Sequence, residues 1–123
     1  IRSPLSRIKL FDTVVKLGFT LPTIVSPRAY ISHQASIGIG SVIMHDVVVS
    51  AGAVIGDNCI INTKSLIEHD CLIGHNVHIS TGAIINGHTK IGSSTFIGSG
   101  AVLRNNLTIK PKTFIKMGTL LKE

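Results

Sequence analysis

A six-residue repeat runs through most of this chain and constrains its fold more than any other feature. Residues 31–120 divide into fifteen consecutive hexads without an insertion or a deletion, from ISHQAS to IKMGTL. The first residue of every hexad is Ile, Val or Leu, and the fifth is Ala, Ser, Cys, Thr or Val except at Leu107. Gly is frequent at the second position. Such a strict short period is typical of a solenoid, in which each repeat packs only on its neighbours.

The repeat predicts a three-sided prism, in which each hexad supplies one short strand and one corner. Eighteen residues then complete a coil, and residues 31–120 make five coils. The first and fifth positions point inward, the second and sixth point outward, and the third and fourth form the corner. Stacked coils lie about 4.8 Å apart and share backbone hydrogen bonds. We therefore expect an all-β fold, a parallel β-helix of about five coils, over residues 31–123.

The first thirty residues have a different pattern. Ser3-Pro4 is followed by apolar residues at helical spacing, and Gly18 closes the run, which predicts an amphipathic helix of about four turns. A short strand over residues 19–25 and a joint at Ser26-Pro27-Arg28 follow. We expect two parts, residues 1–30 with this helix, strand and joint, and residues 31–123 with the β-helix.

Composition excludes several classes of function. The net charge of +6 fits nucleic acid, an anionic membrane or a phosphate-bearing ligand, but the basic residues are scattered and no aromatic platform lies among them, so we expect no nucleic acid partner. There is no leader peptide pattern and no run of 18 apolar residues, so we expect a cytoplasmic protein without membrane insertion. Cys59 and Cys71 fall on inward positions, where a thiol packs as a small hydrophobic group.

The six histidines raise the question of a metal site. A zinc hydratase family resembling carbonic anhydrase uses the same prism and places one His two coils before a His-x4-His pair. His33 and His69 have the first spacing, but residue 74 is Gly74 and the next histidine is His75. We therefore expect no metal, and a metal-dependent hydratase is a minor alternative.

A longer motif points to acyl transfer. Asn62 is followed after seven residues by His69 and Asp70, after nine more by His78, and after nine more by Gly87. These spacings resemble the bacterial sialic acid O-acetyltransferase and UDP-4-amino-sugar N-acetyltransferase family, hexapeptide-repeat enzymes of surface-glycan synthesis. The resemblance implies a left-handed β-helix, a homotrimer, and acetyl-CoA-dependent transfer to a sugar amine or hydroxyl. The nucleotide-sugar-binding domain that precedes the prism in family members has no counterpart in this sequence.

The prism geometry predicts where the motif residues lie. His69 is at a corner, whereas His78 faces outward from the opposite side, so they cannot act on one substrate within a single chain. Gly87 and His88 lie one coil above His69 and Asp70. A threefold assembly brings the corner of one chain to the flat face of the next, which predicts intersubunit sites with a sugar or nucleotide-sugar acceptor.

The roles follow from the chemistry. Imidazole, with an unperturbed pKa of about 6.5, suits proton transfer at neutral pH, so we expect His69 to be the catalytic base, with Asp70 orienting it. The Gly87 N–H is the expected oxyanion donor. The alternative for each corner histidine is a solvated turn residue.

A second set of residues is expected to bind acetyl-CoA. The resemblance implies that Asn62 and His78 hold its thioester end, and Ser80 lies beside them. Gly98 and Lys116 complete the set, and Lys116 belongs to a basic C-terminal segment able to bind phosphates. The alternatives are a solubilising basic face and, for the whole chain, a catalytically idle trimeric scaffold.

Overall fold

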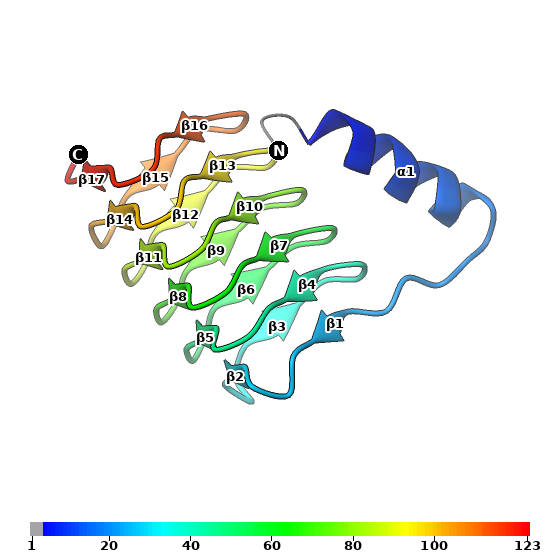
Figure 1. Cartoon of the computed structure of the whole chain (residues 1–123), viewed down its shortest axis with the longest axis horizontal. Helices are drawn as coiled ribbons and strands as arrows, with labels where there is room; N and C mark the ends of the chain where they lie inside the picture. The colour runs from blue at the N-terminus through cyan, green and yellow to red at the C-terminus, as the bar shows by residue number, and fades with distance from the viewer. Residues whose placement is uncertain (1–3) are drawn as a thin grey trace.

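The repeat forms the predicted parallel β-helix in the computed structural model, which describes residues 4–123 (Figure 1). Each strand is two residues long and joins the sixth residue of one hexad to the first of the next. The strands stack in three parallel sheets of six, six and five strands, which confirms a solenoid of about five coils with one helix.

The three sheets are named A, B and C. Sheet A contains β1 (Ile24–Val25), β4 (Val42–Ile43), β7 (Ile60–Ile61), β10 (His78–Ile79), β13 (Phe96–Ile97) and β16 (Phe114–Ile115). Sheet B contains β2 (Tyr30–Ile31), β5 (Val48–Val49), β8 (Leu66–Ile67), β11 (Ile84–Ile85), β14 (Val102–Leu103) and β17 (Leu120–Leu121). Sheet C contains β3 (Ser36–Ile37), β6 (Val54–Ile55), β9 (Leu72–Ile73), β12 (Lys90–Ile91) and β15 (Thr108–Ile109).

The core consists of the inward first and fifth positions, as predicted. Ile61, Ile79 and Ile97 stack on one another along sheet A with no exposed surface. Burying one such side chain contributes about 1.5–3 kcal/mol, so the aliphatic columns hold the coils closed. Cys59 and Cys71 are buried free thiols, and desolvation raises the pKa of Cys59 to about 11. Both therefore act as core residues.

The corners depend on one unusual backbone conformation. From Gly40 to Gly118, the fourth residue of every hexad has a positive φ, between 53° at Asn58 and 73° at Gly52. Gly, Asn and Asp predominate at this position because they tolerate the left-handed region best. Asp70 and His88 also adopt it, each with φ 58°. The backbone thus fixes the direction in which these two side chains leave the corner.

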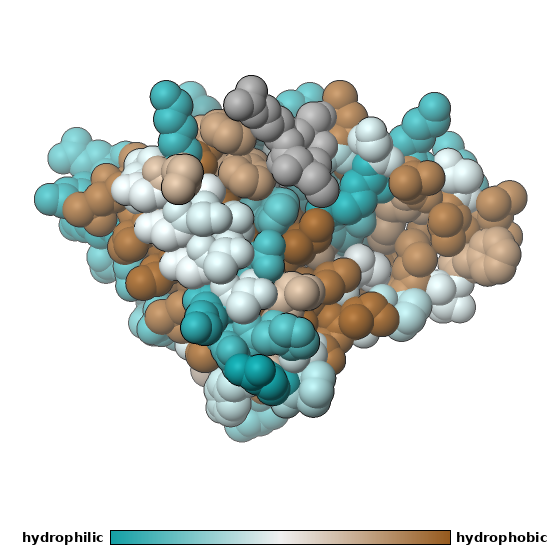
Figure 2. Space-filling model, viewed as in Figure 1, coloured by the Kyte–Doolittle hydropathy of each residue, from teal (hydrophilic) through white to brown (hydrophobic). Residues whose placement is uncertain are grey.

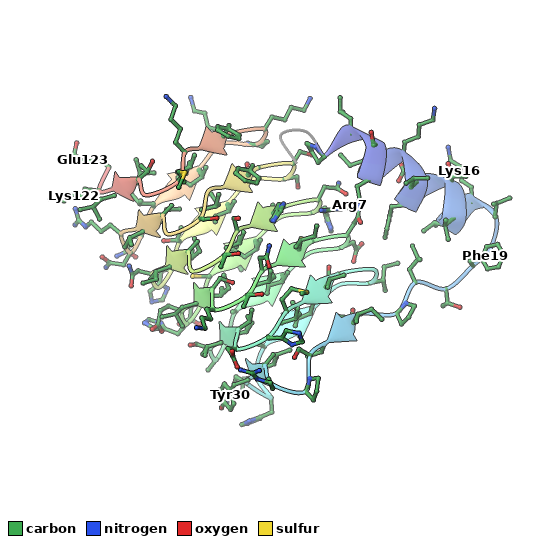
Figure 3. The ribbon with its side chains drawn as sticks, in the orientation of Figure 1. Arg7, Lys16, Phe19, Tyr30, Lys122 and Glu123 are labelled. Carbon is green, nitrogen blue, oxygen red and sulfur yellow. The ribbon has the colours of Figure 1, made fainter. Side chains whose placement is uncertain are left out.

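The N-terminal helix α1 (Leu5–Lys16) runs alongside sheet A and has no buried residue (Figure 1). It begins after Pro4 and ends before Gly18, whose φ of 83° closes it as the sequence predicts; Ser3 lies outside the described residues. Arg7 points toward the solenoid (Figure 3) and donates hydrogen bonds to the carbonyl and side chain of Asn58. The helix is therefore attached to the solenoid by few contacts. Within residues 4–123, no helix has the length and apolar character needed to cross a membrane.

The strand predicted over residues 19–25 is limited to β1, which pairs with β4. Stacked strands therefore begin at Ile24, ahead of the first regular hexad. The division of the chain into two parts at residue 30 stays a prediction.

Replacing Gly82 tests the left-handed corner. A Cβ at this residue meets no atom within 4 Å, and φ is 67°, so the Gly82→Ala variant carries backbone strain without a clash. We expect it to lower the free energy of unfolding by about 1–2 kcal/mol in urea titrations. The control is the Gly82→Asn variant, whose free energy of unfolding should fall less because Asn tolerates this conformation better than Ala does. Equal losses for the two variants would contradict the explanation.

Candidate functional site

The corner between sheets B and C carries the predicted catalytic residues. His69 and Asp70 follow β8, and Gly87 and His88 follow β11 one coil above. The His88 N–H donates a hydrogen bond of 3.0 Å to the His69 carbonyl, which holds the two coils in register. Gly87 therefore stacks on His69 and His88 on Asp70. This B–C corner cluster has the composition that the sequence predicts.

Asp70 lies between the two imidazole rings of the cluster and is hydrogen-bonded to that of His69. His69 Nδ1 lies 3.0 Å from Asp70 Oδ2, and His88 Nε2 lies 3.8 Å from the same oxygen. The rings of His69 and His88 are edge to face, with centroids 5.1 Å apart. With Nδ1 donating to Asp70, Nε2 of His69 keeps its lone pair, which is the form that a general base requires. About half of each side chain is exposed to solvent.

Gly87 supplies the space that the His69 ring occupies. A Cβ at Gly87 would lie 2.7 Å from His69 Nε2 and 2.8 Å from Cε1, so any other residue here displaces the ring. Among the hydrogen bonds of residues 4–123, none uses the Gly87 N–H as donor. A hollow of about 380 Å³ adjoins it, and Glu68, His69, Asn86, Gly87, His88, Arg104 and Asn105 line it. A base and a free N–H donor thus border one cavity.

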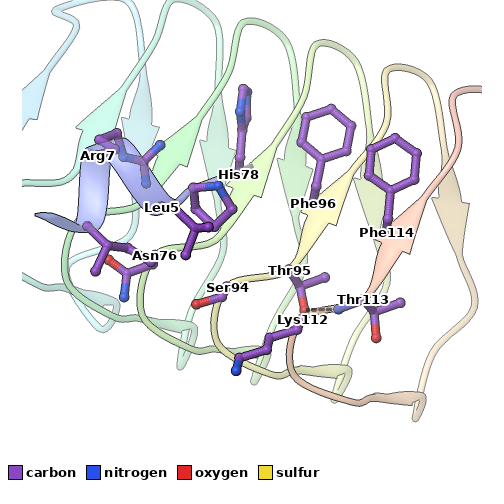
Figure 4. A pocket seen from close by; sticks show the side chains of 12 residues that line it. Leu5, Arg7, Asn76, His78, Ser94, Thr95, Phe96, Lys112, Thr113 and Phe114 are labelled. Atoms are coloured by element: carbon purple, nitrogen blue, oxygen red, sulfur yellow. Dashed lines mark hydrogen bonds between the residues drawn. The ribbon is translucent and has the colours of Figure 1, made fainter. Parts of the chain in front are cut away.

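The outer face of sheet A carries His78 at the start of an aromatic column (Figure 4). The His78 and Phe96 rings meet edge to face at 5.1 Å, and Phe96 stacks on Phe114 at 5.0 Å. A hollow of about 430 Å³ separates this column from α1, where Leu5 and Arg7 help to line it. The helix and sheet A together form an elongated, mostly apolar groove.

His78 is neutral at physiological pH. Burial lowers its pKa from 6.5 to about 4, and the positive charge of Arg7 adds to the effect. Its Nε2 is inaccessible to solvent and has no hydrogen-bond partner among the described residues. An unsatisfied buried nitrogen is costly and needs an explanation, such as a ligand or a partner chain that supplies the missing bond.

Asn62 and Ser80, which are also expected to bind acetyl-CoA, lie on the same outer face as His78, and each is hydrogen-bonded to a neighbouring residue. Asn62 Oδ1 accepts a 2.8 Å hydrogen bond from the Thr63 N–H, and Ser80 Oγ lies 2.9 Å from Ser99 Oγ. Within the described chain, no hydrogen bond joins Asn62, Ser80 and His78 to one another. The three residues therefore lie on one face of the prism without forming a hydrogen-bonded network.

Gly98 and Lys116 lie further along the same sheet. They line a shallow groove of about 810 Å³ together with Phe96 and Phe114. A Cβ at Gly98 would lie 2.4 Å from the backbone nitrogen of Met117. The next coil therefore requires a glycine here, whether or not a ligand binds.

Two features of the site are not predicted from the sequence: the contact of His88 with His69, and the part that α1 plays in the groove. The ring contact of His88 with His69 follows from the eighteen-residue register, which places His88 directly above Asp70. The register could have revealed this contact. The part that Leu5 and Arg7 play in the groove has no comparable signal, because it depends on how α1 docks on sheet A.

Two of the three outer faces carry columns of mainly apolar side chains. On sheet B the column is Tyr30, Val48, Leu66, Ile84, Val102 and Leu120. On sheet A it is Ile24, Val42, Ile60, His78, Phe96 and Phe114. Sheet C is mixed, with Ser36, Lys90 and Thr108 among its outward residues. Figure 2 shows hydrophobic side chains over the strands of sheet B and over those of sheet A, with residues of intermediate hydropathy between them.

Several solved structures match almost the whole chain, and acetyltransferases are among them. The acetyltransferase domain of PglB from Neisseria gonorrhoeae FA1090, in complex with acetyl coenzyme A, has a TM-score of 0.96 and 38% identity over 99% of this chain and 60% of that chain. PerB from Caulobacter crescentus, in complex with CoA and GDP-perosamine, has a TM-score of 0.95 and 30% identity over 100% of this chain and 60% of that chain. WeeI from Acinetobacter baumannii AYE has a TM-score of 0.94 and 28% identity over the same shares.

These similarities confirm the resemblance to hexapeptide-repeat sugar acetyltransferases. The chain spans about 60% of the length of the structures that it matches. No curated protein sequence matches it significantly. The family model described as the GMPPB C-terminal domain matches residues 21–123, and the chain therefore belongs to that family.

Proposed function

We propose that this chain is the acyl-transferring part of a sugar acetyltransferase that moves an acetyl group from acetyl-CoA to the amine of a nucleotide-linked sugar. One observation carries the proposal: the His69 ring, oriented by Asp70, lies against Gly87, whose N–H is free. The similarity to an acetyl-CoA complex of PglB and a GDP-perosamine complex of PerB supports the two substrates. We place the reaction in the cytoplasm, which supplies acetyl-CoA, and in the synthesis of surface glycans.

The acceptor could instead be a hydroxyl, such as that of a sialic acid, because both nucleophiles need the same base and the same oxyanion donor. The similarity to PerB, whose ligand is GDP-perosamine, favours the amine. An amine must also be deprotonated to attack, which is the task of a base at neutral pH.

His69 and Gly87 have different roles in the reaction. His69 Nε2 accepts the proton of the attacking amine as the amine nitrogen bonds to the thioester carbon, and the adjacent Asp70 carboxylate stabilises the imidazolium that forms, as the acidic member of a triad does. The imidazolium then returns the proton to the sulfur as the C–S bond breaks, so CoA leaves as a thiol and His69 is a base again. The Gly87 N–H donates to the oxygen of the thioester carbonyl as it gains negative charge. General base catalysis of this kind contributes about 10²–10⁴ in rate.

The groove on sheet A fits the pantetheine arm and thioester of acetyl-CoA. Its walls are mainly apolar, and His78 presents a neutral imidazole whose Nε2 lacks a partner among the described residues. Asn62 and Ser80 lie on the same face and offer further hydrogen bonds. Gly98 and Lys116 line a second hollow that shares Phe96 and Phe114 with the groove, and a cation there suits the phosphates of CoA.

A homotrimer completes the site. The apolar columns on sheets A and B would remain partly exposed in a monomer, as the exposed fractions of Phe114 (51%) and Val48 (37%) show. Contiguous apolar surface of this kind marks interaction sites. The B–C corner lies at the edge of sheet B, so packing sheet B of one chain against sheet A of the next brings His69 toward His78 of the neighbouring chain. The geometry therefore favours three intersubunit sites.

Substitution of His69 tests the function. We expect the His69→Asn variant to lower kcat for acetyl transfer from acetyl-CoA to an amino sugar nucleotide by about 10²–10⁴ while KM for acetyl-CoA changes little. The matched control is His75→Asn. His75 is also a corner histidine near a carboxylate, 3.7 Å from Asp57 Oδ2, but it lies on the C–A corner. If the two variants lose activity to the same extent, or if neither loses any, His69 is not the base.

Substitution of Gly87 tests the fit of the His69 ring. Its φ is not positive and the clashing atoms belong to an exposed side chain, so the Gly87→Ala variant should keep its free energy of unfolding within about 1 kcal/mol. The displaced ring should nevertheless lower kcat by about tenfold or more, because catalysis tolerates little misplacement. Steady-state kinetics and urea titration of the same preparation check both parts. Full activity in the Gly87→Ala variant would exclude this role for Gly87.

Two valine substitutions test the assembly. Val48 on sheet B and Val54 on sheet C are similarly exposed, at 37% and 44%. The Val48→Glu variant buries a charge in the proposed interface and should dissociate the trimer, whereas Val54→Glu should leave it intact. Light scattering measures the mass of each. Dissociation by Val54→Glu alone would assign the interface to sheet C instead.

The pH dependence of stability tests the state of His78. Its pKa in the folded chain, about 4, is below the ordinary 6.5, so the unfolded chain binds a proton first as the pH falls. The stability due to the neutral ring is complete above pH 6.5 and is lost between pH 6.5 and 4. We expect His78→Phe, which keeps the aromatic column, to lose less stability over this range than the wild type in urea titrations. Parallel curves would show that His78 is not buried as a neutral ring.

A further inference from the structure

The B–C corner carries one ligand-type side chain that acetyl transfer does not use, His88. We propose that His69, Asp70 and His88 bind a divalent transition-metal ion of the zinc class. This ion takes the place of the proton on Nδ1 of His69, so the neutral ring carries its proton on Nε2 and no longer acts as a base, which reversibly inhibits acetyl transfer. The inhibition rests on the proposed function, whereas the binding does not.

The three side chains already converge. One ligand atom from each lies within 4.8 Å of the other two. Asp70 Oδ2 is the shared neighbour, 3.0 Å from His69 Nδ1 and 3.8 Å from His88 Nε2. Ligand atoms about 2.0–2.2 Å from a tetrahedral zinc ion lie roughly 3.3 Å from one another. Small rotations of two half-exposed rings are therefore enough to close the site.

The solenoid holds these groups in place before any ion binds. Asp70 and His88 occupy the same corner position in consecutive coils, both with φ 58°, so their side chains leave the backbone in parallel. The hydrogen bond from His88 N–H to the His69 carbonyl fixes the third member. Binding thus orders few additional groups, which lowers its entropic cost.

The donor set selects the kind of ion. Two imidazoles and one carboxylate suit zinc, copper or nickel, whereas magnesium and calcium prefer oxygen ligands alone. Three protein ligands leave one position for water, which the exposed site can supply. Glu68 and Arg104 line the adjoining hollow, and their opposite charges offset each other, so Asp70 supplies the net negative charge.

The C–A corner provides an internal comparison. His75 Nδ1 lies 3.7 Å from Asp57 Oδ2, but this nitrogen accepts a hydrogen bond from the Asp57 N–H, and the residue stacked above is Ser93. Within residues 4–123, the B–C corner is the one place where three such ligands meet. This cluster does not have the histidine spacing of the zinc hydratase family.

Calorimetric titration of zinc chloride into the metal-free trimer tests the binding. We expect one ion per chain in the wild type and in His75→Asn. The His88→Asn variant, in which Asn tolerates the positive φ, should bind at least about tenfold more weakly because it lacks one ligand. Cobalt(II) provides a second readout, since its visible absorption should report a histidine-containing site in the wild type and lose intensity in His88→Asn. No zinc binding, or equal binding by wild type and His88→Asn, would overturn the site.

Acetyl-transfer assays test the inhibition. Zinc should inhibit the wild type and His75→Asn, and a chelator should restore the rate. The His88→Asn variant should keep most of its own metal-free rate at the same zinc concentration. Zinc that binds at this corner without slowing transfer overturns the inhibitory role. Zinc binding by a protein that transfers no acetyl group supports the site and refutes the proposed function, so the two failures are distinguishable.

Discussion

The eighteen-residue register between coils is the constraint on which the rest of the structure depends. Every coil donates backbone hydrogen bonds to the next in the same alignment, so Ile61, Ile79 and Ile97 stack without an offset. A shift of one residue would turn outward side chains, such as that of Lys90, into the core. The register therefore protects the core and, at the same time, places Gly87 on His69 and His88 on Asp70.

This register explains why much of the molecule can be predicted from its sequence. The strands, the buried cysteines and the B–C corner cluster each follow from a residue's position within its hexad. The geometry around α1 does not, because the helix lies outside the repeat and rests on the solenoid through few contacts, such as Arg7 with Asn58. The burial and neutral state of His78 depend on that docking, so the sequence placed His78 on sheet A without revealing its environment.

The two histidines of the motif differ because of where the prism puts them. His69 is half exposed at a corner and hydrogen-bonded to a carboxylate, which suits a group that must accept and release a proton. His78 lies on the outer face of sheet A against the ring of Phe96, near a guanidinium, and stays neutral. A neutral ring suits a fixed hydrogen bond to an uncharged thioester. In the function that we propose, opposite sides of the prism supply the base and the binding group, so one chain alone would not complete the site.

Mixed trimers test this division most directly. The His69→Asn variant lacks the proposed base and the His78→Ala variant lacks the proposed thioester-binding ring, so each alone should lose most of its activity. The two would be unfolded together, refolded as a mixture and assayed for acetyl transfer. Sites formed between chains predict that the mixture regains a substantial fraction of wild-type activity, because some interfaces then pair an intact His69 with an intact His78. A mixture as inactive as either variant, despite confirmed mixed trimers, would show that the two histidines do not meet across an interface.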